Sequence, residues 1–174
     1  MQLKTYNSFH PEHARLEADI RALTQPIYQF YPHYDIWFQN TFIPGLKKKE
    51  RLYTIAQTET GVVTGCILMK NTANEKKICT LFVRPEFRHQ GIGTALIRQA
   101  IQELGDYPLI TIPQENMPLF FPLLTRLGFH LSAARKGIYR NNIMEYFFND
   151  KRADAVHQKL IPVLRQRTQE LERC

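Results

Sequence analysis

Residues 88 to 93 read Arg-His-Gln-Gly-Ile-Gly, a turn with two glycines between an apolar run and a helical pattern. The apolar run extends from Ile78 to Val83, and the helical pattern extends from Thr94 to Leu104. Glycine has no Cβ, so it accepts positive φ and lets main-chain N–H groups approach a ligand, and the helix that follows adds its partly positive N-terminus. A strand, a glycine turn and a helix in this order predict a phosphate-binding unit.

Two well-known glycine loops fit this stretch poorly. A dinucleotide fingerprint needs a third glycine or alanine, but here Gly91 and Gly93 are followed by Leu96, and no acidic residue ends a second parallel strand at the expected distance. A P-loop needs Gly-Lys-Ser/Thr, and the chain contains no such tripeptide. Nicotinamide binding and nucleotide hydrolysis are therefore both disfavoured.

The remaining pattern, Arg/Gln-x-x-Gly-x-Gly/Ala, is matched in order by Arg88, Gly91 and Gly93. It resembles the coenzyme A pyrophosphate loop of the GNAT superfamily of N-acetyltransferases, in its bacterial type. The wider stretch LFVRPEFRHQGIGTALIRQAIQELG strengthens the resemblance, because such enzymes carry an apolar strand, a proline-containing turn and then this loop and helix. The helix shows a one-sided apolar stripe, formed by Leu96, Ile97, Ala100, Ile101 and Leu104.

The resemblance implies an α/β (α+β) fold in which helices flank a mixed, mostly antiparallel central sheet. Expected strands are 52–57, 62–70, 77–83, 108–112, 129–135 and 143–148, and expected helices are 11–28, 33–45, 94–104 and 117–127. Residues 1–150 should form a single GNAT domain, and residues 151–174 a C-terminal helical extension interrupted by Pro162.

Length and composition narrow the class of protein. A chain of 174 residues with 44% hydrophobic content is long enough for one globular domain with a substantial core. It has neither a hydrophobic signal core at its start nor the roughly 20 apolar residues that span a bilayer, which predicts a cytoplasmic protein without a membrane partner.

Metal binding is not expected. The three cysteines are widely spaced and odd in number, so they offer neither a disulfide framework nor a C-x-x-C pair. Cys66 and Cys79 lie in apolar strand patterns and are expected in the core. His10 and His13 share a helical face but have no cysteine or carboxylate companion.

The formal net charge of +7 allows two kinds of anionic partner. One is coenzyme A, which carries several phosphate charges, and the other is nucleic acid; a solvated basic surface without a specific partner is the third interpretation. The basic clusters consist of Lys47, Lys48, Lys49 and Arg51, of Lys76 and Lys77, and of Arg135, Lys136 and Arg140.

The resemblance also implies which residues hold acetyl-CoA. Main-chain groups of Leu81, Phe82 and Val83 should pair with the pantetheine arm, and an N–H near Val83 should polarise the thioester carbonyl. Asn116 resembles an asparagine that contacts the cofactor, although its spacing to Gly128 is one residue longer than usual. The pyrophosphate should lie on amides of Arg88, His89, Gln90, Gly91, Ile92, Gly93 and Thr94.

Proton transfer is harder to assign. Many GNAT enzymes place a tyrosine four residues before the glycine of Gly-Phe as general acid, but Leu124 occupies that position here. Tyr139 is the substitute candidate, because a phenol can donate to a thiolate; its alternative role is packing at a strand start. Glu145 is a candidate base, and its alternative role is that of an exposed strand glutamate. Thr80 and Phe82 occupy positions that some members of the superfamily give to glutamate.

The acceptor pocket is the least defined part of the site. Tyr31, Tyr34 and Trp37 could line it, because the segment between the first two helices often does so in this superfamily, or they could fill the core.

The first functional hypothesis is direct, acetyl-CoA-dependent transfer of an acetyl group to a primary amine of a small molecule, peptide or protein, by a monomer or homodimer. A GNAT toxin that acetylates aminoacyl-tRNA and a catalytically silent acyl-CoA-binding module are the alternatives, and nucleic acid is the less favoured partner.

Overall fold

The computed structural model describes residues 1–8 and 14–153 of the chain. Its sheet has seven strands in the order β1-β2-β3-β4-β5-β7-β6. Neighbouring strands are antiparallel except for β4 and β5, which are parallel, so the expected mixed and mostly antiparallel sheet is confirmed. The strands are β1 (Gln2–Tyr6), β2 (Arg51–Gln57), β3 (Val63–Asn71), β4 (Lys76–Val83), β5 (Leu109–Pro113), β6 (Leu131–Lys136) and β7 (Met144–Phe148).

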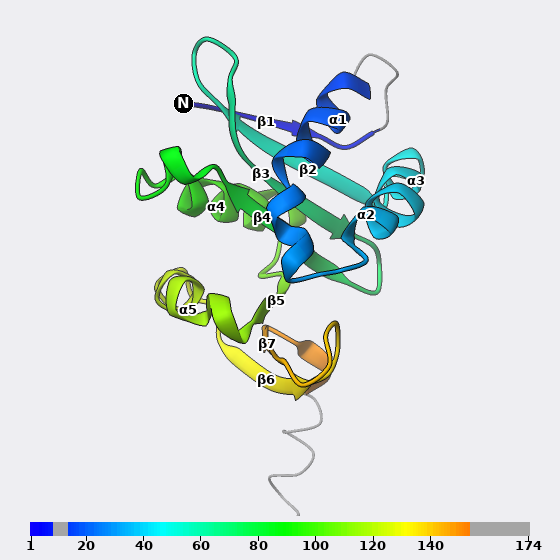
Figure 1. Ribbon diagram of the computed structural model, residues 1–174, viewed down its shortest axis with the longest axis vertical. Coiled ribbons are helices and arrows are strands. Elements are labelled where there is room, and N and C mark those ends of the chain that lie inside the picture. Colours follow the sequence, from blue (N-terminus) through cyan, green and yellow to red (C-terminus); the bar gives the residue numbers. More distant parts are fainter. Residues whose placement is uncertain (9–13, 154–174) are drawn as a thin grey trace, which may run out of the picture.

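Helices cover both faces of this sheet. Helices α1, α2 and α3 pack on one face, and α4 and α5 pack on the other; in Figure 1, α1 to α4 lie with β1 to β4 in the upper half of the view, and α5 lies with β5 to β7 in the lower half. The α-helices are α1 (Ala14–Leu23), α2 (Tyr34–Trp37), α3 (Ile43–Lys47), α4 (Ile92–Leu104) and α5 (Met117–Arg126), and a π-helical turn, η3 (Phe38–Phe42), joins α2 to α3. Short 3-10 turns are η2 (Gln25–Gln29), η4 (Pro85–Phe87) and η5 (Gln114–Asn116).

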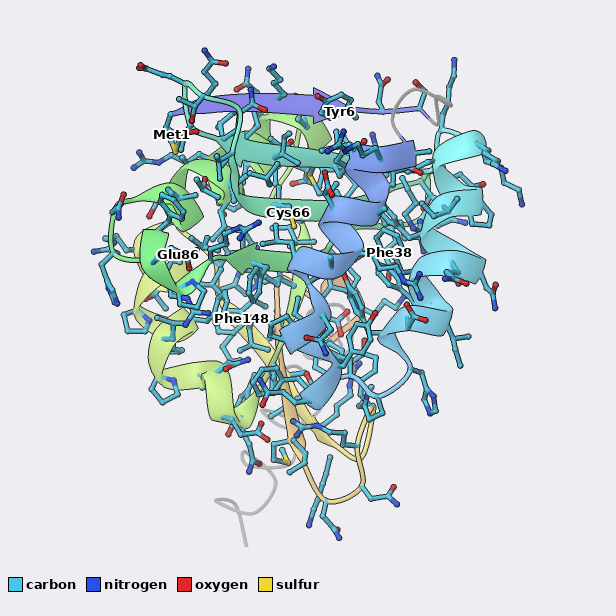
Figure 2. The ribbon with its side chains drawn as sticks, turned by 45° about the horizontal axis from the view of Figure 1, so that its top comes forward. Met1, Tyr6, Phe38, Cys66, Glu86 and Phe148 are labelled. Atoms are coloured by element: carbon cyan, nitrogen blue, oxygen red, sulfur yellow. The ribbon has the colours of Figure 1, made fainter. Side chains whose placement is uncertain are left out.

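The sheet separates two hydrophobic clusters because side chains alternate along each strand. In β3, Cys66 and Leu68 face the cluster formed with α1 to α3, whereas Ile67 and Met69 face the cluster formed with α4 and α5. Figure 2 shows Cys66 in the middle of the sheet and Phe38 in the helical layer beside it. The predicted apolar stripe of α4 is buried in the second cluster, with Leu96 fully enclosed.

The N-terminal third differs from the sequence prediction. The helix expected over 11–28 ends at Leu23 and is followed by the separate 3-10 turn η2, because Pro26 lacks an N–H and disfavours helical backbone before it. The expected start at Pro11 lies outside the described residues. Strand β1 was not expected; it forms the outer strand beside β2.

The extension expected over 151–174 can be followed only at its start. Residues 151–153 are helical, and the remainder of the expected extension lies outside the described residues.

The strand pair β4–β5 positions the site. It is joined only at Lys77 with Leu109 and at Ile78 with Ile110. Beyond Ile78, β4 keeps its antiparallel partner β3, while β5 continues along β7 on its far edge. The edge of β4 that faces β5 is therefore free of a strand partner over its last residues, and its N–H and C=O groups are available to another chain or ligand.

Candidate active site

A cleft of about 620 Å³ opens where β4 and β5 separate. Its walls come from β4, β5, the loop that follows β4, the first turn of α4, one side of α5 and the turn η2. Among the described residues the lining contains no Asp or Glu; its side chains that carry or can carry positive charge are Arg88, His89 and Arg126.

One end of the cleft is the N-terminus of α4. Gly91 precedes the helix with φ of 79°, a left-handed conformation that favours glycine, and no side chain caps the helix. The first intrahelical bond runs from Ala95 N–H to Gly91 C=O at 3.0 Å, so the N–H groups of Ile92, Gly93 and Thr94 have no partner within the helix. These free donors and the helix dipole make an anion-binding end.

The space in front of this end is open. A Cβ built on Gly91 would meet no atom within 4 Å. His89, two residues earlier, also has positive φ, at 61°, so the loop turns twice before the helix begins. Figure 2 shows Glu86 in the loop that leads to α4.

Not all side chains of the loop between β4 and α4 face the cleft. The Arg88 Nε donates to the carbonyl of Val83 at 3.1 Å, and its guanidinium lies 5.9 Å from the ring centroid of Phe82, which holds a positive charge at the end of β4. Gln90 is not among the cleft-lining residues; its amide donates to the carbonyl of Glu86 at 3.3 Å. The remaining predicted loop positions line the cleft: His89, Gly91, Ile92, Gly93 and Thr94.

The middle of the cleft follows the free edge of β4. Leu81, Phe82 and Val83 all line it, as does Asn116 at the start of α5. Thr80 pairs with Leu68, and Ile78 pairs with Met69, so Cys79 is an extra residue that forms a β-bulge at the point where β4 and β5 separate. Cys79 therefore lies on the cleft, not in the core where the sequence placed it, whereas Cys66 is fully buried as expected.

A buried carboxyl group lies behind the lining at the other end of the cleft. Glu145 on β7 is 1% exposed, so the alternative of an exposed strand glutamate is wrong. Neither of its carboxyl oxygens has a hydrogen-bond partner of full geometry among the described residues. Burial raises the pKa of Glu145 to about 7, against the opposing effects of Arg140, the Tyr31 hydroxyl and Lys77.

Tyr31 is close to both this carboxyl group and the cleft. Its side chain lines the cleft, and burial raises the pKa of its hydroxyl above the ordinary tyrosine value. Its ring packs edge-on against Tyr139, with centroids 4.9 Å apart. Tyr139 itself is 40% exposed, is not among the lining residues, and accepts a hydrogen bond from Lys77 Nζ at 3.3 Å.

The other two predicted acceptor residues do not line the cleft: Tyr34 is buried, and Trp37 is partly buried. Tyr34 is 5% exposed and its hydroxyl accepts a hydrogen bond from Thr80 Oγ1 at 3.2 Å. Trp37 packs against Tyr34 with ring centroids 5.4 Å apart. Both belong to the cluster between the sheet and the N-terminal helices.

An ion pair joins the turns near the end of the cleft beside Tyr31. Arg140, in the turn between β6 and β7, donates to both carboxylate oxygens of Glu115, at 2.9 and 3.0 Å. The same guanidinium lies 5.7 Å from the ring centroid of Phe30, which lines the cleft. The hydrogen bonds from Arg140 lower the pKa of Glu115.

Two further findings concern residues that the sequence did not assign to the cleft. Leu124 is fully buried in the core, while its neighbour Leu123 lines the cleft, so the residue at the usual tyrosine position does not reach the site. Thr80 and Thr111 line the cleft and were not assigned to it. The signal for them was a polar residue inside an otherwise apolar strand.

The basic clusters are largely engaged in the fold. Arg135 pairs with Asp150 at 2.8 Å and lies over the Phe147 ring, and Lys76 donates to the carbonyl of Leu104. Within residues 1–8 and 14–153, no group of three or more His, Cys, Asp or Glu side chains could hold a metal ion. The helices in the same part of the chain are too short or too polar to cross a membrane.

Several solved structures share this fold. The ribosomal-protein-S18-alanine N-acetyltransferase from Escherichia coli is 18% identical, with a TM-score of 0.63 over 84% of this chain and 92% of that one. An aminoglycoside 6'-N-acetyltransferase solved with coenzyme A is 11% identical, with a TM-score of 0.58 over 85% and 95%. At these identities, the likeness concerns the fold.

A candidate streptothricin acetyltransferase from Bacillus anthracis str. Ames, solved with acetyl coenzyme A, is 20% identical with a TM-score of 0.50. That match covers 57% of this chain and 61% of the other, so this chain spans less than two thirds of that relative. No curated protein matches the chain significantly.

The sequence profile of the acetyltransferase (GNAT) domain matches residues 49–142, more than half of the chain. This range contains β2 to β5, the glycine loop, α4 and α5, which together build most of the cleft. The chain therefore belongs to the GNAT acetyltransferase family.

Proposed function

We propose that this protein transfers an acetyl group from acetyl-CoA directly to a primary amine of a small molecule, peptide or protein. The observation that carries the proposal is the cleft itself, which runs from the uncapped N-terminus of α4, along the free edge of β4, to the acceptor end beside Tyr31. The cleft joins an anion site at one end to an end lined by side chains.

The donor would be held mainly by the backbone. Amides of Ile92, Gly93 and Thr94 suit its pyrophosphate, and the free main-chain groups of residues 81–83 suit the amides of the pantetheine arm. Acetyl-CoA supplies an activated thioester carbonyl. A main-chain N–H of β4 near that carbonyl would stabilise the negative charge that develops on its oxygen.

Tyr139 is the proposed proton donor for the departing thiolate. It lies one ring behind Tyr31, and the Lys77 ammonium donates to its hydroxyl. A phenol in this position can pass a proton towards the cleft and is ready to regain one from solvent, because it is partly exposed.

The charge of the cleft favours an acceptor with a single amine over a polycation. The lining contains no Asp or Glu among the described residues, and Glu115 nearby is neutralised by Arg140. A polyamine such as an aminoglycoside would bring several positive charges to a cleft that already holds Arg88 and Arg126. A peptide N-terminus or a small monoamine brings one charge and loses it before reaction.

The direct test is release of the coenzyme A thiol in the presence of a panel of amines. We expect turnover with short peptides or monoamines and weaker turnover with aminoglycosides. Calorimetry should show binding of acetyl-CoA without any acceptor. Binding without turnover for every amine would favour the silent acyl-CoA-binding module.

The tRNA alternative has its own test. Because Lys76, Arg135 and Arg140 are engaged within the fold, we propose that the basic surface serves capture of the donor more than recognition of nucleic acid. Retarded migration of tRNA at physiological salt, lost on neutralising Lys47, Lys48 and Lys49, would overturn this preference and support an aminoacyl-tRNA acceptor.

A further inference from the structure

The proposed reaction needs a base, and the cleft lining supplies no carboxylate. An amine enters as an ammonium ion at neutral pH and must lose a proton before it can attack. Among the described lining residues there is no Asp or Glu, and His89 belongs to the loop at the donor end. A proton acceptor for the amine therefore has to lie behind the lining.

Glu145 occupies such a position. Its strand β7 runs antiparallel to β5, where Glu145 pairs with Pro113, and to β6, where it pairs with Arg135. Pro113 and Thr111 of β5 both line the cleft, so the carboxyl group lies next to the cleft wall. Because β7 is paired with a strand on each side, the position of Glu145 is fixed by the sheet.

The carboxyl group is also unsatisfied. Both oxygens are fully buried and have no hydrogen-bond partner of full geometry among the described residues. A buried polar group without a partner is costly, and such groups in folded proteins call for a reason beyond packing. The Tyr31 side chain lines the cleft and lies close enough to Glu145 for its hydroxyl to lower the pKa of that carboxyl group.

We propose that Glu145 accepts the proton of the acceptor ammonium through the hydroxyl of Tyr31, which connects the cleft to the buried carboxylate. The inference rests on the proposed function. Tyr31 is then the residue that touches the acceptor, and Glu145 acts through it.

The proton balance is simple. The ammonium gives one proton to the Tyr31 oxygen, and the Tyr31 hydroxyl gives its own proton to the Glu145 carboxylate. The neutral amine attacks the thioester carbonyl carbon, a C–N bond forms, and the C–S bond breaks. The leaving thiolate then takes up a proton, while the amide nitrogen loses its excess proton to solvent.

The electrostatic surroundings are suited to this role. Glu145 is acted on by Arg140 and Lys77, which favour its charged form, and by Glu115 and burial, which oppose it. Its pKa of about 7 means that the carboxylate is partly free at neutral pH and binds a proton more strongly than an ordinary glutamate. Tyr139, whose ring packs on Tyr31, is a further titratable group near this end of the cleft.

The test is the pH profile of kcat/KM for a saturating donor and one reactive amine. In the unmodified protein, we expect kcat/KM to rise with pH through an apparent pKa near 7. Glu145→Gln should lower turnover by roughly 10² to 10⁴ and remove this rise of kcat/KM with pH, the acidic limb of the profile. Tyr31→Phe should also lower turnover, and it should move the limb to higher pH, because the Tyr31 hydroxyl lowers the pKa of Glu145.

Glu17→Gln is the matched control. Glu17 on α1 is also buried, has an unpartnered oxygen and has a pKa raised by burial, but it is not among the cleft-lining residues and belongs to the layer of N-terminal helices. This variant should keep both the turnover and the limb. Unchanged turnover and an unchanged limb in Glu145→Gln would overturn the proposal while leaving the acetyltransferase function intact.

A second measurement does not depend on activity. Titration of the Glu145 carboxyl by carbon-13 NMR should give a pKa near 7, raised further in Tyr31→Phe. A value near 4, or one that Tyr31→Phe leaves unchanged, would contradict the link between the two side chains even if no amine proved to be a substrate.

Discussion

The two ends of the cleft are built in different ways. The donor end comes from one continuous segment, residues 78–94, and its binding groups are main-chain atoms of a free strand edge and an uncapped helix. The acceptor end brings together side chains that are far apart in the chain, such as Tyr31, Thr111 and Glu145. The first end depends on local conformation, and the second depends on the tertiary fold.

This contrast predicts a separation of measurable effects. Substitutions at the donor end should change the affinity for acetyl-CoA, because they alter the groups that hold it. Substitutions at the acceptor end should change turnover or its pH dependence and leave that affinity alone. A variant that moves both quantities together would show that the two ends are coupled.

The largest expected effect is that of Tyr139→Phe. If Tyr139 gives a proton to the thiolate, loss of its hydroxyl should lower kcat by roughly 10² to 10⁴ and leave acetyl-CoA affinity unchanged, since the ring that packs on Tyr31 is kept. Single-turnover kinetics would isolate the chemical step. Undiminished turnover would assign Tyr139 to packing and leave solvent as the proton donor.

The second effect concerns stability and pH. Glu145 has a pKa of about 7 in the fold, above the value of 4.5 for an ordinary glutamate, so the folded protein binds more protons than the unfolded chain between these values. The free energy of unfolding should therefore be highest below pH 4.5 and should fall by up to ~3 kcal/mol as pH rises from 4.5 to about 7.

Urea unfolding at pH 4.5 and pH 8, which bracket the two pKa values, would measure this change. Glu145→Gln should flatten the dependence and be the more stable protein at pH 8. Glu17, whose pKa is also raised by burial, contributes with the same sign, so Glu17→Gln should remove only its own part. Equal slopes in the unmodified protein and in Glu145→Gln would indicate that the carboxyl group is better solvated than its burial implies.

The third effect tests the donor end. Gly91→Val places a side chain at the N-terminus of α4 and should weaken acetyl-CoA binding at least roughly tenfold, a loss of ~1.4 kcal/mol. Because Gly91 has φ of 79°, the substitution also strains the backbone. Gly61→Val is the matched control: it has φ of 86°, an equally open surrounding and a place in the β2–β3 hairpin. We expect the two variants to show similar losses of Tm, and Gly91→Val to show the larger loss of affinity for acetyl-CoA.

The same contrast explains how far the sequence could be interpreted. The order of strands from 51 onward, the glycine turn and the helix after it were predictable, because alternation, helical periodicity and glycine all act locally. Ten of the eleven residues expected to hold the donor line the cleft, and the exception, Gln90, is turned to a neighbouring carbonyl. Strand β1 was missed because its residues alternate weakly and are only half-buried at best.

The acceptor end could not be predicted to the same degree. Tyr31, Tyr34 and Trp37 belong to one aromatic segment, but only Tyr31 reaches the cleft: it lies in the link between η2 and α2, whereas Tyr34 and Trp37 lie on α2 and pack against the N-terminal cluster. The burial of Glu145 depends on its place between β5 and β6, and no pattern within β7 indicates it. These features follow from contacts between distant segments.

The smallest expected effect comes from Glu115→Gln, which tests whether the acceptor end responds as one electrostatic unit. The ion pair with Arg140 is partly exposed, so its loss should cost less than about 1 kcal/mol of stability. Glu115 raises the pKa of Glu145 and holds Arg140, which lowers it. Removing the Glu115 charge should therefore lower the pKa of Glu145 and move the limb of kcat/KM slightly to lower pH, with kcat and acetyl-CoA affinity preserved. A shift to higher pH would mean that Arg140 moves away from Glu145 once its partner is lost, and would identify the ion pair as the element that keeps this guanidinium near the base.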